Sequence, residues 1–121
     1  MKVIIDLIED IRESIQNNEM YSITGMLLKE DANNKKNLLY AGEASVGSFY
    51  LDKISKELIF NVDKKADSLS VGELVKHLLI LDMDAMMYEV KLAVSEEHAP
   101  KELVGFGFNA TDGKYALFIM A

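Results

Sequence analysis

Apolar residues recur at helical spacing in two segments of the chain. Residues 3–17 carry an apolar residue at every third or fourth position, and their acidic residues fall on the opposite side of a helical projection. The same spacing runs from Val71 to near Leu81. It follows a capping box, in which the Ser70 hydroxyl can accept from the amide of Glu73. The pattern therefore predicts two amphipathic helices.

The other apolar positions favour short strands. Four are expected between the two helices, and three after the second helix. Their ranges are 21–29, 38–41, 49–51, 58–60, 86–94, 104–109 and 114–120. A polar segment at 31–37 predicts a loop, and residues 52–56 predict a turn. Alternating apolar and polar residues over 86–94 are typical of a strand that is wet on one side, as in antiparallel sheets.

The expected order of elements is α-β-β-β-β-α-β-β-β. It predicts an α+β fold, with an antiparallel sheet of about six or seven strands and two helices packed on it. A length of 121 residues indicates one domain spanning 1–121.

Asp112-Gly113 favours a two-residue hairpin turn between the last two strands. Counting back from this turn pairs Phe108 with Leu117, Phe106 with Ile119, Gly107 with Phe118, and Gly105 with Met120. Large residues then face glycines on one side, where a ring can cover the exposed backbone. On the other side, both phenylalanines of 105–108 point into the core.

The sequence Gly-Phe-Gly-Phe at 105–108 resembles the centre of the RRM octamer, whose aromatic rings stack on RNA bases. The resemblance implies RNA binding, but three observations argue against it. The opposite face of this strand offers Gly105, Gly107 and Asn109, which cannot fill a core. The helix and strand that should follow are replaced by a tight turn and eight residues. The net charge of −7 repels phosphate.

Charge and composition narrow the classes of partner and site. With 13 basic and 20 acidic residues, the chain is repelled by nucleic acids and by anionic membranes, so neither is expected as a partner. The chain has no cysteine, which excludes disulfides, thiolate zinc sites and thiol catalysis. Its apolar runs are too short to span a bilayer, and we expect a cytoplasmic location.

No constellation of catalytic or metal-ligating residues stands out. Asp82 and Asp84 resemble the paired aspartates of haloacid-dehalogenase-like phosphatases, but they follow a capped helix instead of a parallel strand. The acids and histidine at 96–98 lack calcium-loop spacing. Neither His77 nor His98 has a nucleophile at a recognisable spacing. We therefore assign no catalytic, cofactor-binding or metal site and expect no cofactor.

The last strand is apolar on both faces, with Leu117 and Ile119 on one side and Phe118 and Met120 on the other. Either the two helices cover different faces of the sheet, or Phe118, Met120 and neighbours such as Met87 stay exposed. Contiguous exposed apolar surface indicates a partner, most often a second copy.

We therefore expect a non-enzymatic, acidic protein-interaction module that forms a homo-oligomer, with a dimer as the first expectation. Its candidate interface is Met87, Phe118 and Met120. The alternative is a protein that binds a small ligand or metal ion, or a modest enzyme, with a pocket between helix and sheet.

Overall fold

The computed structural model describes residues 1–13, 18–63 and 67–120. Helix α1 spans Ile4–Glu13 and α2 spans Val71–Leu78, and the short 3-10 helices are η1 at Asn18–Met20 and η2 at Met83–Met87. The strands are β1 at Ser22–Asp31, β2 at Asn34–Asp52, β3 at Glu57–Val62, β4 at Glu89–Ala93, β5 at Lys101–Glu102, β6 at Gly105–Asn109 and β7 at Lys114–Met120. Two helices and a seven-stranded sheet make the fold α+β.

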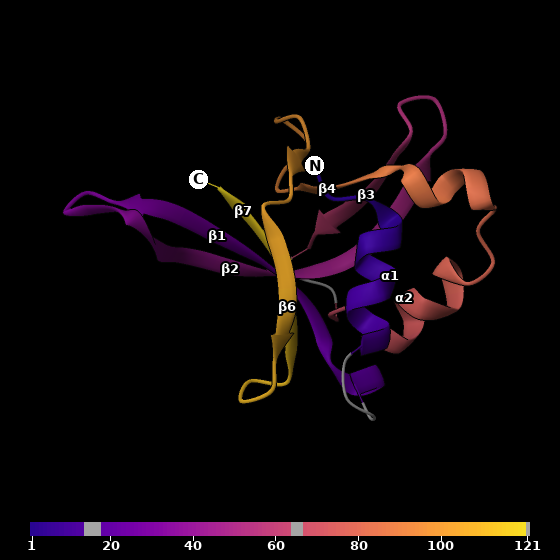
Figure 1. Cartoon of the computed structure of the whole chain (residues 1–121), viewed down its shortest axis with the longest axis horizontal. Helices are drawn as coiled ribbons and strands as arrows, with labels where there is room; N and C mark the ends of the chain where they lie inside the picture. The colour runs from indigo at the N-terminus through magenta and orange to yellow at the C-terminus, as the bar shows by residue number, and fades with distance from the viewer. Residues whose placement is uncertain (14–17, 64–66, 121) are drawn as a thin grey trace.

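The sheet is mixed, so the expectation of an antiparallel sheet is wrong. Its strand order is β5-β4-β3-β2-β1-β7-β6, and the pairs β1–β7 and β3–β4 are parallel. Parallel neighbours need a crossover connection. Helices α2 and η2 supply one between β3 and β4, and the last strand returns across the sheet to lie beside the first (Figure 1).

Strand β2 is continuous over 19 residues where two separate strands were expected. Its first part pairs with β1 and its last part with β3, and a register shift between Val46 and Ser48 marks the change of partner. The expected polar loop at 31–37 is reduced to a tip between Asp31 and Asn34, which pair with each other. The hairpin of β1 and β2 projects from the body of the protein, so its tip lies away from the helices (Figure 1).

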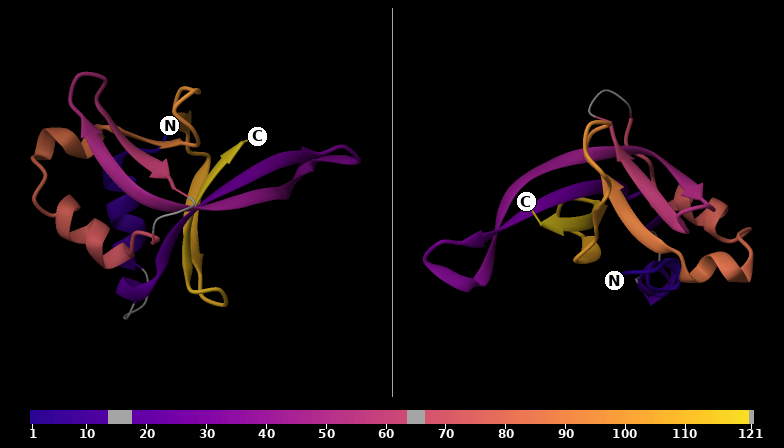
Figure 2. Two further views of the ribbon diagram at one scale, coloured as in Figure 1. Left: turned by 180° about the vertical axis from the view of Figure 1, so that it is seen from behind. Right: turned by 90° about the horizontal axis from the view of Figure 1, so that it is seen from above.

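Both helices lie on the same, concave side of the curved sheet, which we call the inner face (Figure 2). The Tyr115 hydroxyl of β7 reaches Asp10 of α1, and the Phe49 ring of β2 contacts His77 of α2, with ring centroids 5.4 Å apart. One continuous hydrophobic cluster joins the two helices to the sheet. Its members include Ile4, Leu7, Ile11, Ile23, Val46, Phe60, Leu74, Leu78, Leu92, Leu117 and Ile119.

The two helices begin where their sequence patterns indicate. Ser70 caps α2, and its hydroxyl oxygen accepts from the amide of Glu73 at 3.1 Å, which confirms the predicted N-cap; the Ser70 hydroxyl also lies 3.2 Å from the Glu73 carboxylate. Helix α2 ends at Leu78, earlier than the expected end near Leu81. The first helix is described to Glu13, and the rest of its expected span, 14–17, lies outside the described residues.

The hairpin of β6 and β7 has a longer loop than expected. Asn109 pairs with Lys114, which leaves four residues in the loop, and Gly113 is its one residue with positive φ, at 65°. The Asn109 side chain closes the loop by accepting from the amide of Asp112 at 3.3 Å. The true pairs are therefore Gly105 with Phe118, Phe106 with Leu117, Gly107 with Ala116, and Phe108 with Tyr115.

This register differs from the expected one by two residues, so every side chain keeps its expected face. Phe106 and Phe108 lie on the inner face and pack against the core. The Phe108 ring contacts the ring of Tyr115, with centroids 4.4 Å apart, and that of Tyr21, at 5.3 Å. The two rings are thus engaged with other aromatic side chains and do not form an open stacking platform.

Candidate functional site

The opposite, convex side of the sheet is its outer face, and its apolar residues gather on β1 and β7. Met26 lies beside Phe118 and Leu28 beside Met120 in the parallel pairing of these strands, and all four side chains are half-buried. We call these four residues the outer apolar row. Both α-helices lie on the inner face, so neither covers the row (Figure 2).

The Phe118 ring extends from β7 over the neighbouring strand β6. Its Cδ2 atom lies 3.8 Å from the position that a Cβ would take at Gly105. A Cβ at Gly107 would meet nothing within 4 Å. The ring therefore covers a glycine as expected, although the glycine is Gly105 and not Gly107, and open space remains above the centre of β6.

The two edges of the sheet differ in length and in charge. Strand β5 has only two residues, Lys101 and Glu102, and both side chains are engaged. The Lys101 ammonium donates to the carbonyl of Met120 at 3.2 Å, and Glu102 pairs with the N-terminal ammonium at 3.2 Å. Strand β6 at the other edge has five residues, none of them charged.

Met87 does not join the other two candidate interface residues. It lies in η2 with 69% of its surface exposed, and η2 (orange) is well separated from β7 (yellow), which runs through the middle of the molecule (Figure 1). The segment that leads to it from the end of α2 carries other exposed apolar residues, Leu79, Ile80 and Met83. The structure thus brings Phe118 and Met120 together with Met26 and Leu28, which the sequence did not single out because β1 and β7 are remote along the chain.

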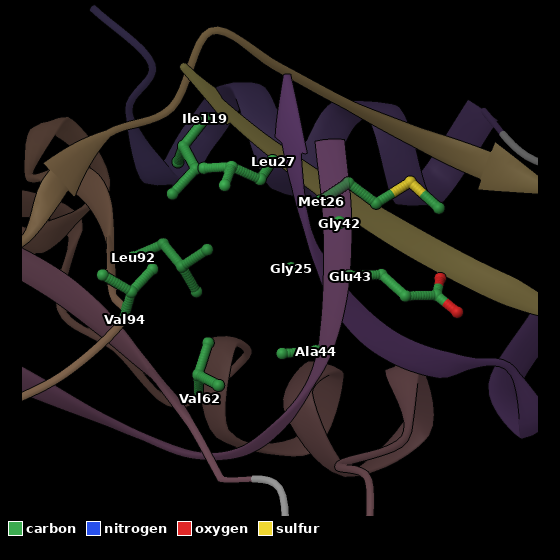
Figure 3. A pocket seen from close by; sticks show the side chains of 10 residues that line it. All are labelled: Gly25, Met26, Leu27, Gly42, Glu43, Ala44, Val62, Leu92, Val94 and Ile119. Atoms are coloured by element: carbon green, nitrogen blue, oxygen red, sulfur yellow. The ribbon is translucent and has the colours of Figure 1, made fainter. Parts of the chain in front are cut away.

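A hollow of about 260 Å³ opens on the inner face, where the β1–β2 hairpin leaves the body (Figure 3). The side chains that point into it are apolar, and come from Leu27, Val62, Leu92, Val94 and Ile119. Small residues on neighbouring strands, Gly25, Gly42 and Ala44, form its other wall. Met26 and Glu43 contribute backbone, and their side chains point away. With only apolar side chains directed into it, this hollow can hold an apolar group but offers no side chain for acid–base chemistry.

A second hollow, of about 710 Å³, is lined by more polar residues. Tyr50 and Asn61 come from β2 and β3, and the segment after β4 adds Ser95, Glu96 and His98. The Ser95 hydroxyl lies 2.8 Å from His98 Nδ1, and both side chains are exposed. Within the described residues, no group of three or more histidine and acidic side chains is placed to hold a metal ion. The sequence pointed to residues 96–98 but could not place Tyr50 and Asn61 beside them, because that proximity depends on strand pairing.

The remaining candidate residues occupy structural or exposed positions. Asp82 precedes η2 and Asp84 lies within it, and both are exposed, as expected for a polar turn. His77 stands edge-on to the ring of Phe49. Neither the paired aspartates nor this histidine lines the two hollows described above.

The displaced pKa values belong to groups that tie the fold together. Burial raises the pKa of the Tyr115 phenol, and the 2.8 Å hydrogen bond that it donates to Asp10 raises it further. On the outer face, the hydrogen bond from Lys91 lowers the pKa of Glu57, and the same contact raises the pKa of Lys91. The Tyr115 phenol keeps its proton and links β7 to α1, and the Glu57 carboxylate is paired with Lys91 and links β3 to β4. Both groups therefore stabilise the fold.

No family model, curated protein or solved structure matches the chain. In the part of the chain that the structure describes, every helix is too short or too polar to cross a membrane. The candidate site therefore rests on geometry. Its most developed feature is the end of the sheet formed by β6 and β7, which combines the outer apolar row with an uncharged edge strand.

Proposed function

We propose that the chain is an acidic, non-enzymatic protein-interaction module that self-associates as a dimer through the β6–β7 end of its sheet. The observation that carries this proposal is the position of both helices on the inner face, which leaves Met26, Leu28, Phe118 and Met120 without helical cover. Neighbouring apolar side chains on a surface favour contact with a partner, and a two-fold dimer is the commonest assembly. The proposal places this dimer in the cytoplasm.

The chemistry of the hollows supports a role in binding over one in catalysis. Side chains that enter the inner hollow are apolar, and the polar hollow has its serine and histidine on an exposed loop. General acid–base catalysis needs a positioned group with a suitable pKa. The described residues with displaced pKa values are instead ion-paired, hydrogen-bonded to the backbone, or buried in the core.

Sedimentation velocity over the micromolar range tests the proposal. We expect the wild-type chain to sediment as a dimer, and Phe118→Glu to shift it toward monomer with a dissociation constant raised roughly tenfold or more. The control is Met87→Glu, which adds the same charge on the exposed η2, well away from β7, and should leave the dimer intact. Circular dichroism establishes that both variants are folded. A monomeric wild-type chain, or equal association by Phe118→Glu, contradicts the proposal.

A second candidate function is the binding of a small ligand, and the inner hollow favours it. Apolar pockets near this size can take up small hydrophobic molecules. A thermal-shift screen with metabolites, apolar compounds and divalent ions would detect such binding as a saturable rise in the unfolding temperature. Gly42→Leu is the matched variant, because a Cβ at Gly42 meets nothing within 4 Å and a larger side chain there would occupy the hollow. A rise that survives in Gly42→Leu would place the ligand elsewhere.

A further inference from the structure

The edge strand β6 lacks the features by which proteins protect the edges of their sheets. Natural edges are kept from pairing by charges, prolines, bulges or very short strands. Strand β5 is protected in this way, since it is two residues long and both are charged. Strand β6 has the sequence GFGFN, with no charge and no proline, and its pairing with β7 shows no register shift.

The edge of β6 that faces away from β7 has no strand paired with it in the described chain. The sheet ends at this strand, and among the described residues the backbone of 105–109 pairs with β7 alone. The unpaired amides and carbonyls of an edge strand form a template for another strand. A second strand of the same sequence carries the amides and carbonyls that can satisfy them.

We propose that β6 pairs antiparallel with β6 of a second copy, with Gly107 on the two-fold axis, so that the two sheets become one. This inference rests on the proposed self-association and specifies which strand forms the contact between the two copies. With the axis at Gly107, Phe106 of each copy faces Phe108 of the other, giving two aromatic pairs across the seam on the inner face. Such cross-strand aromatic pairs stabilise antiparallel sheets.

Charge favours this edge over other places where two copies could meet. Each chain has a net charge of −7, so two copies repel each other wherever they bring acidic surfaces together. The five residues of β6 carry no charge, and the nearest acids along the chain, Glu102 and Asp112, lie beyond the ends of the strand. On the outer face, the Phe118 ring of each copy covers Gly105 of β6, next to the proposed seam. A carboxylate at position 118 would bring a negative charge from each copy close to the seam, and the repulsion would weaken the dimer.

A charge at Gly107 tests the seam directly. A Cβ at this position meets nothing within 4 Å, so the isolated chain can accept Gly107→Lys. In the proposed dimer the two lysines would lie opposite each other at the axis, and like charges in that position destabilise a strand pair. We expect sedimentation to show a dissociation constant raised tenfold or more. The control is Thr111→Lys, which makes the same charge change in the exposed hairpin loop and should remain dimeric.

A mixing experiment guards against a variant that is merely unfolded. Gly107→Glu should also be monomeric, and an equimolar mixture with Gly107→Lys should form a heterodimer, because the axis places the lysine opposite the glutamate. Amide hydrogen exchange adds a local readout. Alternate amides of β6 should be protected in the wild-type dimer and lose protection in Gly107→Lys, while β7 stays protected in both.

The outcomes separate this inference from the proposed function. A wild-type chain that stays monomeric overturns both. A wild-type dimer that persists in Gly107→Lys overturns the β6 seam and leaves self-association through the outer apolar row standing. Loss of the dimer in Thr111→Lys as well, or failure of the two Gly107 variants to associate when mixed, also overturns the seam.

Discussion

The two faces of β7 have similar apolar character but different environments. On the inner face Tyr115, Leu117 and Ile119 are at most 1% exposed, because the helices and β6 pack around them. On the outer face Phe118 and Met120 are half-buried and lie beside Met26 and Leu28 of β1. The same strand therefore contributes to the core with one face and to the proposed contact surface with the other.

This difference shows that the position of the helices, more than the composition of the strand, decides the role of each residue. Alternation alone places residues on two faces but does not say which face is covered. Because both helices lie on one side of the sheet, an apolar residue on the other side is left for a partner. The comparison can be tested residue by residue along the strand and across the sheet.

The largest effect is expected from truncating the inner face of β7. Leu117→Ala removes a fully buried side chain, which should lower the free energy of unfolding by about 2–5 kcal/mol. Phe118→Ala removes a larger side chain from the outer face but should cost the monomer only about 1 kcal/mol, because less apolar surface is re-exposed. Urea unfolding at low protein concentration measures both. Equal losses would contradict the assignment of the two faces.

Local patterns were sufficient to predict the helices and the inward-facing residues. The capping box at Ser70 is a signal contained within four residues, and it appears as expected. The inward direction of Phe106 and Phe108 was also predicted, even though the pairing count was wrong, because an error of two residues keeps the faces. The error arose because the Asn109 side chain stabilises a four-residue loop that Asp112-Gly113 alone does not reveal.

The arrangement of strands could not be read from local patterns. The long β2 changes its pairing partner along its length. The polar sequence at 31–37 predicted a loop because it lacks the alternation of apolar and polar residues by which strands are recognised. The parallel pairing of β1 with β7 depends on contacts between the two ends of the chain. For the same reason the sequence found Phe118 and Met120 but missed Met26 and Leu28, and it grouped Met87 with residues that lie far from it.

A smaller effect is expected from the polar group on the inner face. Tyr115→Phe removes the hydroxyl that donates to Asp10 and should lower the free energy of unfolding by about 1–2 kcal/mol at neutral pH. The pKa of Tyr115 in the folded state is raised above its ordinary value near 10, chiefly by burial. The folded state therefore holds this proton more tightly than the unfolded state, and the stabilisation is lost as the pH rises above 10.

Denaturant unfolding of the wild type and Tyr115→Phe across the alkaline range measures this difference. The gap in unfolding free energy should be largest at neutral pH and should narrow above the ordinary pKa of tyrosine. The two proteins differ only at position 115, so the contributions of all other groups cancel in the comparison. A gap that stays constant into the alkaline range would mean that the Tyr115 hydroxyl has the same environment folded and unfolded.

The smallest effect is expected from the ion pair of Glu57 and Lys91 on the outer face. Both side chains are partly exposed, at 16% and 25%, so Glu57→Gln should cost less than about 1 kcal/mol at neutral pH. The hydrogen bond from Lys91 lowers the pKa of Glu57 below its ordinary 4.5, so the pair stabilises the fold above that pH, and the contribution is lost as the pH falls. The difference between wild type and Glu57→Gln should therefore vanish in acid. A difference in unfolding free energy that persists in acid would come from packing of the Glu57 side chain, and would contradict the assignment of this stabilisation to its charge.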